Sequence, residues 1–306
     1  MNLKQSLFLL SFILLSPALY AAEAVTLTTE DSWNLAANYS ASKNGKAVIL
    51  LHDIDKSKAD FTAFEQKLAN AGYGYLAIDM RGHGGSTGLG VQKDFKKTGT
   101  DNEFNQMVRD VNSGVAFLSA KGISVTNIYL LGEGLGANVA AKSLIFNKDA
   151  AGLVLLTPSL KTRDVLTMNG LKLYKNPVLI AVSAEDKKAF MEASFIRNAA
   201  FLSSGEGKVT FLTAYDKSGA EMMDKYLTYN ILQWLDTPAL PEIKPDAVAV
   251  EETPITIEGG DLPLPAASEE EAVVLPPPSV LPKANPAPQQ KPTATNTVAA
   301  GSFDIL

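Results

Sequence analysis

The sequence has 306 residues, of which 46% are hydrophobic, and it contains no cysteine. This length and apolar content allow one large core, while the lack of cysteine excludes disulfides and the lipid-anchored cysteine of a bacterial lipoprotein. The formal net charge is −6, but ten acidic and three basic residues fall within residues 237–306, so the preceding part is close to neutral. A near-neutral body without a basic cluster excludes nucleic acid as the expected partner.

The first 24 residues have the layout of a secretory signal peptide. Lys4 precedes an apolar run over residues 7–15, and small residues follow it. The run is shorter than the roughly 20 apolar residues that cross a bilayer, and no later stretch is long enough, so no membrane span is expected. We expect the mature protein in the periplasm or outside the cell. The signal peptide could be cleaved after Ala21, after Ala22 or after Ala24.

Apolar runs alternate with helical stretches between residues 25 and 236. The sequence predicts eight strands: Val25–Thr29, Trp33–Tyr39, Ala47–Leu51, Tyr73–Ile78, Ile128–Leu131, Gly152–Leu156, Val178–Ser183 and Lys208–Leu212. It predicts five main helices: Phe61–Ala71, Glu103–Ala120, Gly136–Ile145, Asp186–Ala200 and Glu221–Leu235. The last six strands are continuous apolar runs, which is typical of parallel strands covered on both faces. The order predicts an α/β fold with a mixed, mostly parallel, doubly wound eight-stranded sheet.

The connection between the strands that end at Leu156 and begin at Val178 is about 21 residues long. It contains a short stretch of predicted helix near Thr162–Met168. This is too little chain for a cap domain, so the carboxyl edge of the sheet is expected to be open at the surface.

Residues 237–306 differ in composition from everything before them. They hold thirteen of the sixteen prolines, including the run Pro276-Pro277-Pro278, and the acidic run Glu269-Glu270-Glu271. This composition predicts an extended, largely disordered tail with polyproline II character. We expect the tail to act as a spacer or, alternatively, to dock a partner domain.

One segment has the pattern of a sharp strand-to-helix turn. The apolar run Ile128–Leu131 leads into Gly132-Glu133-Gly134-Leu135-Gly136, and a helix-forming stretch follows. In a G-x-S-x-G turn, or nucleophile elbow, the middle residue is a serine whose hydroxyl attacks a carbonyl. Here the middle residue is Gly134, which has no side chain to attack with.

Four segments, taken in order, resemble the α/β-hydrolase superfamily, and in particular its lidless monoacylglycerol-lipase or serine-aminopeptidase type. These segments are Ala47–His52, Asp79–Ser86, Gly132–Gly136 and Val178–Asp186. The resemblance implies an α/β-hydrolase domain over residues 25–236. It also implies a family chemistry in which a serine, an acid and a histidine hydrolyse ester or amide bonds.

The triad that this resemblance assigns is incomplete. Its positions are Gly134 for the nucleophile, Asp186 for the acid and Ser218 for the base. Only Asp186 has the residue type that the triad uses, because Ser218 stands where the family has a His-Gly pair. The chain has two histidines, His52 and His83, and both precede the elbow. No imidazole is therefore expected at the position of the base, where one is needed to activate a hydroxyl nucleophile.

The resemblance places the oxyanion loop at His52 and Asp53, and it places Leu135 directly after the nucleophile position. The family has a His-Gly pair where this chain has His52-Asp53. A carboxylate near this loop would disfavour a developing oxyanion by like-charge repulsion. Three further residues complete the elbow: Gly132, Glu133 and Gly136.

These departures predict an exported pseudoenzyme, a protein with the α/β-hydrolase fold that binds or scaffolds without hydrolysing. Its ligand would be a small molecule or a protein, and no cofactor is expected. The alternative is a weak or non-standard esterase or peptidase, in which Ser86, Ser183 or Ser218 acts together with Asp186.

A metal site is not predicted, because the sequence has no close spacing of ligands such as H-x-x-x-H. Imidazole and carboxylate groups do follow two strands that should be adjacent, and together they would suit a divalent ion. The residues concerned are His52, Asp53, Asp55, Asp79 and His83.

Overall fold

The computed structural model describes residues 22–215, 217–223 and 225–238. Residues 1–21 of the predicted signal peptide lie outside the described part of the chain. The predicted tail lies outside it from residue 239 onward. The described residues therefore span the predicted α/β domain.

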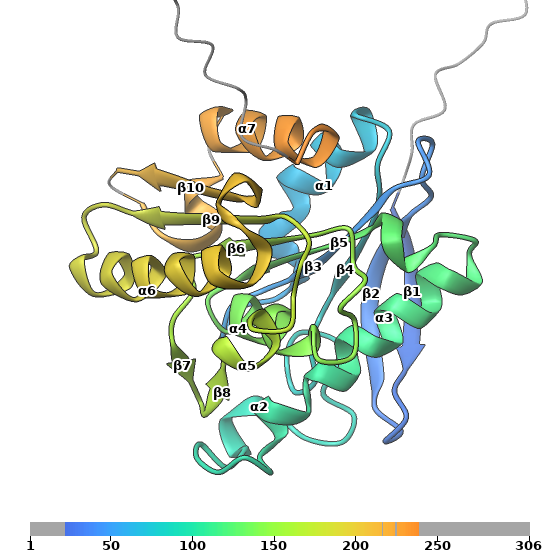
Figure 1. The fold of residues 1–306 in the computed structure, drawn as a ribbon. Coiled ribbons are helices and arrows are strands. Elements are labelled where there is room, and N and C mark those ends of the chain that lie inside the picture. The colour runs from blue at the N-terminus through green and yellow to red at the C-terminus, as the bar shows by residue number, and fades with distance from the viewer. Residues whose placement is uncertain (1–21, 216, 224, 239–306) are drawn as a thin grey trace, which may run out of the picture. The chain divides into compact units, whose positions relative to one another are not determined.

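Eight strands form one sheet: β1 (Glu23–Thr28), β2 (Asn34–Ser40), β3 (Ala47–Leu51), β4 (Gly74–Ile78), β5 (Ile128–Glu133), β6 (Gly152–Leu156), β9 (Val178–Ser183) and β10 (Val209–Ala214). Their order across the sheet is β1-β2-β4-β3-β5-β6-β9-β10 (Figure 1). The pairs β1–β2 and β2–β4 are antiparallel, and the strands from β4 to β10 are parallel. This arrangement confirms the predicted mixed, mostly parallel sheet with an antiparallel start.

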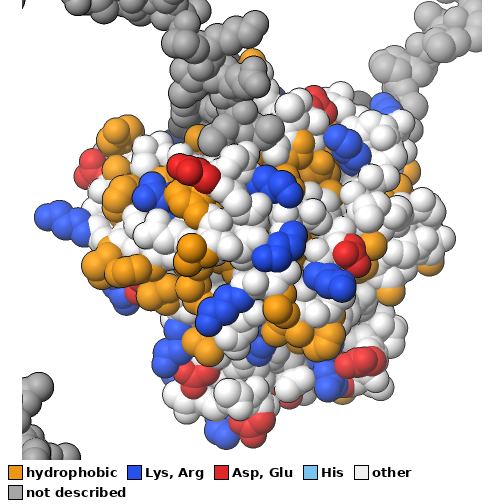
Figure 2. Space-filling view, in the orientation of Figure 1, with side chains coloured by type: hydrophobic (Ala, Val, Ile, Leu, Met, Phe, Trp, Pro, Cys, Tyr) orange, Lys and Arg blue, Asp and Glu red, His pale blue; other side chains and the backbone are white. Residues whose placement is uncertain are grey.

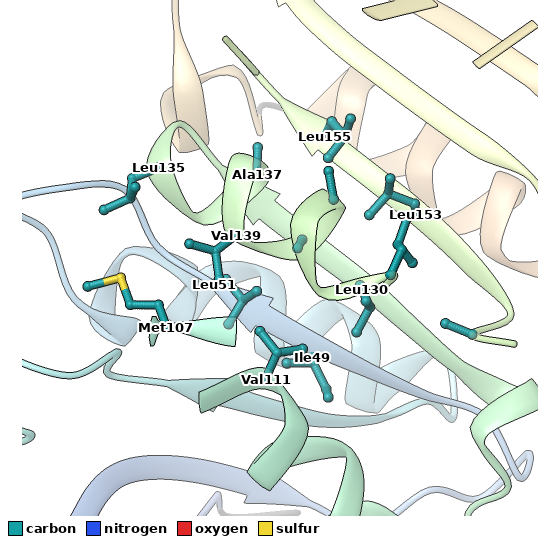
Figure 3. Packing of buried hydrophobic residues seen from close by; sticks show 14 of the residues in the cluster. Ile49, Leu51, Met107, Val111, Leu130, Leu135, Ala137, Val139, Leu153 and Leu155 are labelled. Atoms are coloured by element: carbon teal, nitrogen blue, oxygen red, sulfur yellow. The ribbon is translucent and has the colours of Figure 1, made fainter. Parts of the chain in front are cut away.

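The central strands are buried on both faces and point alternate side chains into two hydrophobic cores. In β3, Ile49 and Leu51 belong to one core, whereas Val48 and Leu50 belong to the other. Figure 3 shows Ile49 and Leu51 packed with residues of two of the helices that cover the first core. This packing explains why β3 is a continuous apolar run instead of an alternating one.

Helices α3 (Val108–Ala120), α4 (Leu135–Ser143), α5 (Met168–Leu171) and α6 (Lys187–Ser204) cover the first core, and the short α2 (Glu103–Gln106) adds Phe104 to it. Two helices, drawn toward the top of Figure 1, cover the second: α1 (Thr62–Asn70) and α7 (Lys225–Asp236). Short 3₁₀ turns complete the body: η1 (Lys58–Phe61), η2 (Gln92–Asp94), η3 (Val125–Asn127), η4 (Glu206–Lys208) and η5 (Gly219–Met222). None of the helices within the described residues is long and apolar enough to cross a bilayer.

Two predicted helices differ from the observed structure. The stretch predicted over Glu103–Ala120 is divided at Met107 into α2 (Glu103–Gln106) and α3. The stretch near Thr162–Met168 is not a helix and instead forms a small antiparallel ladder of β7 (Lys161–Thr162) and β8 (Val165–Leu166).

The turn between β7 and β8 contains Arg163 and Asp164, both with positive φ angles (51° and 61°). Contacts from a distant loop hold this turn. The side chain of Asn102 donates to the Arg163 carbonyl (2.9 Å), and the Gly99 amide donates to Asp164 Oδ2 (2.7 Å). These tertiary hydrogen bonds override the local helix preference. Between β6 and β9, where every residue is described, the chain forms β7, β8 and α5 and no cap domain.

The surface of α6 is partly apolar. Its buried residues are Ala193, Ile196 and Ala200, while Met191 and Phe195 are about half exposed (55% and 53%). Figure 2 shows apolar side chains gathered on this side of the molecule, over the position of α6 in Figure 1. The even distribution of apolar residues around α6 explains why the sequence predicts the helix without predicting which face is buried.

Candidate functional site

The carboxyl ends of the parallel strands meet at one edge of the sheet, where ligand sites of open α/β sheets are formed. At this edge, β5 ends at Glu133 and α4 begins at Leu135, so that Gly134 alone makes the turn. Gly134 has φ 51° and ψ −114°, a strained conformation that glycine adopts readily. This geometry is the sharp strand-to-helix turn predicted from the sequence.

The two outer glycines of the elbow are required by close backbone approaches. A Cβ atom on Gly132 would overlap the backbone of Gly136, and one on Gly136 would overlap the carbonyl of Leu51 in β3. Both glycines therefore allow α4 to pack directly against the ends of β3 and β5. The elbow is intact as a backbone structure although its middle residue has no side chain.

The carboxylate of Asp53 lies where the middle residue of the elbow would carry its side chain. A Cβ atom built on Gly134 would overlap Cγ and both carboxylate oxygens of Asp53. Asp53 Oδ1 accepts hydrogen bonds from the backbone amides of Leu135 (2.7 Å) and Ile54 (2.7 Å). In an active elbow, the amide after the nucleophile and one from the loop after the third strand bind the oxyanion. Here the internal carboxylate already holds the Leu135 amide, with an ionic acceptor that strengthens the bond.

Glu133 lies beneath the elbow and is 1% exposed. Its Oε1 atom is 3.0 Å from the ammonium group of Lys56, which comes from the loop after β3. Its Oε2 atom has no hydrogen-bond partner among the described residues. Burial raises the pKa of the Glu133 carboxyl, and a backbone hydrogen bond from Ala220 and the charge of Lys56 offset only part of this shift.

Ser218 lies across the cavity from the elbow and is exposed. Its hydroxyl is 3.3 Å from the hydroxyl of Thr157, which follows β6 and has a positive φ of 47°. The Gly219 amide donates to the same Thr157 hydroxyl (2.9 Å). A Cβ on Gly219 would overlap Glu133 Oε1, so a glycine lets this segment close over the buried carboxylate.

Together these groups surround a cavity of about 220 Å³, which we call the elbow cavity. Its lining residues are Asp53, Lys56, Glu133, Gly134, Thr157, Ser218, Gly219 and Glu221. The structure thus brings together the predicted nucleophile position, the predicted base position and the oxyanion loop.

The predicted acid position lies elsewhere. Asp186 is exposed and is not among the lining residues of the elbow cavity. It is the N-cap of α6, and its Oδ1 accepts a hydrogen bond from the Ala189 amide (2.9 Å). This bond satisfies one of the free amides of the first helical turn, so Asp186 has a structural role that needs no histidine.

Two of the three candidate serines are buried outside the elbow cavity. Ser86 donates to the Asp79 carbonyl (2.6 Å) and accepts from the Ala36 amide (2.9 Å), which joins the turn after β4 to β2. Ser183 is 2% exposed, and its hydroxyl accepts from the Glu185 amide (3.2 Å). Ser218 is the candidate that faces the elbow.

The histidines hold the loops after β3 and β4. His52 accepts from the Met80 amide at Nε2 (3.1 Å) and therefore donates from Nδ1 to the Asp53 carbonyl (2.7 Å). Burial lowers the pKa of His52 to about 4, which keeps the ring neutral. Both ring nitrogens are engaged, so His52 cannot bind a metal without losing a hydrogen bond. Within the described residues, no group of three or more His, Cys, Asp or Glu side chains is placed to hold a metal ion.

Arg81 of the Asp79–Ser86 segment has a structural role. Its guanidinium group is fully buried and contacts Asp110 (2.8 Å), Asp31 (2.7 Å) and Glu103 (3.1 Å). These carboxylates raise the pKa of Arg81, outweighing the opposite effect of burial. Burial alone would raise the pKa of Asp31, but its bonds to Arg81 lower it to about 2. The network ties the turn after β4 to α2, α3 and the β1–β2 connection.

Sequence reasoning missed Lys56, Thr157 and Glu221 as residues of the site. None of them belongs to a motif, and each reaches the cavity because of how a loop folds. A signal for Lys56 was present in principle, because a glutamate at the end of a fully apolar strand needs a nearby cation or donor.

The chain was compared with known proteins. Residues 42–204 match the family described as serine aminopeptidase, S33. The comparison with curated proteins found no match. Among solved structures, the Pyrococcus furiosus esterase Pf2001 is 20% identical with a TM-score of 0.59, over 72% of this chain and 91% of that one.

Two further esterases are similar to the chain in fold. The esterase EaEST from Exiguobacterium antarcticum is 15% identical with a TM-score of 0.54, over 70% of this chain and 100% of that one. An acetyl xylan esterase from Paenibacillus sp. R4 is 13% identical with a TM-score of 0.57, over 72% of this chain and 85% of that one. At these identities the likeness concerns the fold.

Proposed function

We infer the function from one premise: this chain belongs to the serine aminopeptidase S33 family of α/β-hydrolases. From it we propose that the protein is a non-catalytic member of the family, which uses the elbow cavity to bind a ligand and does not hydrolyse it. The observation that carries this proposal is the Asp53 carboxylate, which lies against Gly134 and holds the Leu135 amide.

The chemistry of acyl transfer supports this proposal. Gly134 has no nucleophilic atom, and the two histidines of the chain lie in loops after β3 and β4. Serine proteases that lack triad members still accelerate the reaction about 10³–10⁴-fold over water. This remaining activity depends on the oxyanion hole and on substrate binding. Loss of one oxyanion donor costs a further factor of about 10²–10³. Here Asp53 occupies the Leu135 donor and adds negative charge where negative charge would develop.

A second candidate function is non-standard hydrolysis of an ester. Family membership and the fold shared with esterases favour it, and so does the position of Ser218 at the elbow cavity. In this version the Ser218 hydroxyl would be the nucleophile, and Glu133, whose pKa burial raises, would be the base. The hydrogen bond between Ser218 and Thr157 would have to be exchanged for one to the base.

Labelling with a fluorophosphonate probe tests the proposal. We expect no labelling of the wild-type protein, because no activated serine is present. Labelling of the wild type would contradict the non-catalytic proposal, and its loss in Ser218→Ala would assign the reaction to the second candidate.

A pair of engineered variants tests the role of Asp53. Gly134→Ser/Ser218→His restores two family residues, and a second variant adds Asp53→Gly. We expect labelling only of the variant with all three changes, because Asp53 otherwise overlaps the new serine. Equal labelling of both variants would show that the carboxylate does not block the elbow.

A further inference from the structure

Strand β10 lies at the edge of the sheet and, among the strands that the structure describes, pairs with β9 alone (Figure 1). Edge strands of soluble proteins usually carry charged residues, proline or a bulge, because their free amides and carbonyls would otherwise pair with another strand. The six residues of β10 include no charged residue and no proline. Their register with β9 is unbroken, so the strand has no bulge either. This edge therefore lacks the usual protections against strand pairing.

The hydrogen bonds around β10 show which of its backbone groups are free. The Ala184 amide donates to the Ala214 carbonyl (2.8 Å), so the backbone polar groups of Ala214 point toward β9. The amide and carbonyl of one strand residue point to the same side, and successive residues alternate. The groups of Val209, Phe211 and Thr213 therefore point away from β9. The Val209 amide already donates to the Glu206 carbonyl of its own turn.

The remaining free groups are self-complementary. Phe211 and Thr213 lie on either side of Leu212, and each offers one outward donor and one outward acceptor. A two-fold axis normal to the sheet at Leu212 places Phe211 opposite the partner's Thr213, and Thr213 opposite the partner's Phe211. Each pair then exchanges two N–H···O bonds, as in an antiparallel ladder. Such a contact uses the same surface on both copies and closes after two of them.

The side of α6 that adjoins β10 is aromatic. The Phe190 ring packs edge-on against the Phe211 ring (5.8 Å between centroids), and the Arg197 guanidinium lies over the rings of Phe201 (5.5 Å) and Phe211 (5.1 Å). Phe190 is 36% exposed, and Phe201 and Phe211 are partly exposed. Aromatic residues and arginine are enriched in protein interfaces. The helix beside the strand therefore extends the surface that a second copy would cover.

The opposite edge of the sheet differs from β10. Strand β1 begins with the charged residue Glu23, and its exposed side chains also include Ala24, Thr26 and Thr28. In β10, by contrast, large apolar side chains lie on both faces, with Phe211 against the first core and Leu212 against the second. β10 is thus the edge whose side chains suit burial.

We propose that two copies of this chain associate through β10, so that their two sheets form one continuous sheet across a two-fold axis. The occupant of the edge is a second copy, because the free donors and acceptors match their own arrangement and the strand carries no charge that would repel its copy. This dimer goes beyond the proposed function and does not depend on it, since no residue of β10 lines the elbow cavity.

Sedimentation equilibrium of the full chain over a dilution series tests the dimer. We expect twice the mass of the chain, with dissociation on dilution. Thr213→Pro should raise the dissociation constant at least about tenfold, because it removes a donor of the ladder and places a ring against the partner strand. The amide that it removes points away from β9, so the pairing within each sheet is kept. Thr213→Ser, which keeps this amide, should dimerise like the wild type.

Hydrogen exchange resolved to single amides tests the same contact in the wild type, without relying on the folding of a variant. We expect the amides of Phe211 and Thr213 to exchange more slowly at high protein concentration than at low concentration. The Leu212 amide, which points toward β9, should be protected at both concentrations. A monomer at every concentration, equal dimerisation of Thr213→Pro when that variant folds, or exchange of Phe211 and Thr213 that does not depend on concentration would overturn the proposal.

Discussion

Gly134 and Asp53 share the volume that the side chain of an elbow residue would fill. Asp53 follows β3 and Gly134 follows β5, and the Leu135 amide, which is next to Gly134, donates a hydrogen bond to the Asp53 carboxylate. Each residue therefore limits what the other position can carry. A side chain at residue 134 requires that Asp53 move or be replaced.

A stability cycle measures this dependence. Gly134→Ala should lower the free energy of unfolding by about 1–3 kcal/mol, because alanine is strained at φ 51° and its Cβ would overlap Asp53. In the Asp53→Gly background the overlap is gone, and the same substitution should cost about 1 kcal/mol less. Denaturant unfolding of the four proteins gives both values. Additive effects of the two substitutions would show that Asp53 does not contact residue 134.

His52 should make the protein less stable as the pH falls from about 6.5 to 4. Burial lowers its folded-state pKa from 6.5 to about 4, so in this range the unfolded chain binds a proton that the folded chain does not. The loss due to this group reaches about 3 kcal/mol and is complete below pH 4. Above pH 6.5 the ring is neutral in both states and contributes no pH dependence.

Urea unfolding of the wild type and of His52→Gln between pH 8 and pH 4 checks this expectation. His83, Asp79 and Lys58 face the same ring and are present in both proteins, so the difference between the two curves reports His52. We expect the variant to lose less stability on acidification, even though its stability at pH 8 is lower. Parallel curves would mean that His52 is not the neutral ring that the structure indicates.

At the scale of single elements, β1 bears on the proposed export of the protein. The strand begins at Glu23, where Glu23 pairs with Tyr39 and Ala24 pairs with Asn38. Cleavage after Ala24 would remove both pairs, whereas cleavage after Ala21 or Ala22 leaves the strand complete.

We propose that the protein is exported and expect its mature chain to begin at Ala22 or Glu23. Intact-mass measurement of the protein recovered from the periplasm or medium of an expressing bacterium determines this end. A mature chain that begins at Val25 would contradict the argument from β1. Unprocessed protein that stays in the cytoplasm would contradict export.

At the scale of the whole molecule, the described residues form two hydrophobic cores. Among these residues, members of the first core extend in sequence to Phe211 and members of the second to Leu235. The described lining of the elbow cavity extends to Glu221. We therefore expect the described part of the chain to fold as one unit.

A chain that ends at Pro238 should unfold cooperatively at nearly the same temperature as the full-length protein. We expect the midpoint to change by less than about 2 °C, which corresponds to less than about 1 kcal/mol for a domain of this size. Scanning calorimetry of both chains provides the measurement. A much lower midpoint for the shorter chain would show that residues beyond 238 pack on the domain.

Much of the fold could be predicted because its signals are local. Continuous apolar runs such as Val178–Ser183 mark the strands, and the glycines around residue 134 mark the elbow. The β7–β8 turn could not be predicted in this way. Its positive φ angles at Arg163 and Asp164 depend on hydrogen bonds from Asn102 and Gly99, about 60 residues earlier in the chain.

By itself, the sequence determined the class of fold, the position of the elbow, and the absence of a serine at the elbow and of a histidine at the base position. These properties follow from residue identity and from short-range periodicity. The tertiary structure decided where Asp53 and Asp186 act. Asp53 reaches an amide 82 residues away, and Asp186 caps the helix that it begins. The reason is physical: chain connectivity gives the order of the elements, but only their packing brings a carboxylate to an amide, a cation or a cavity.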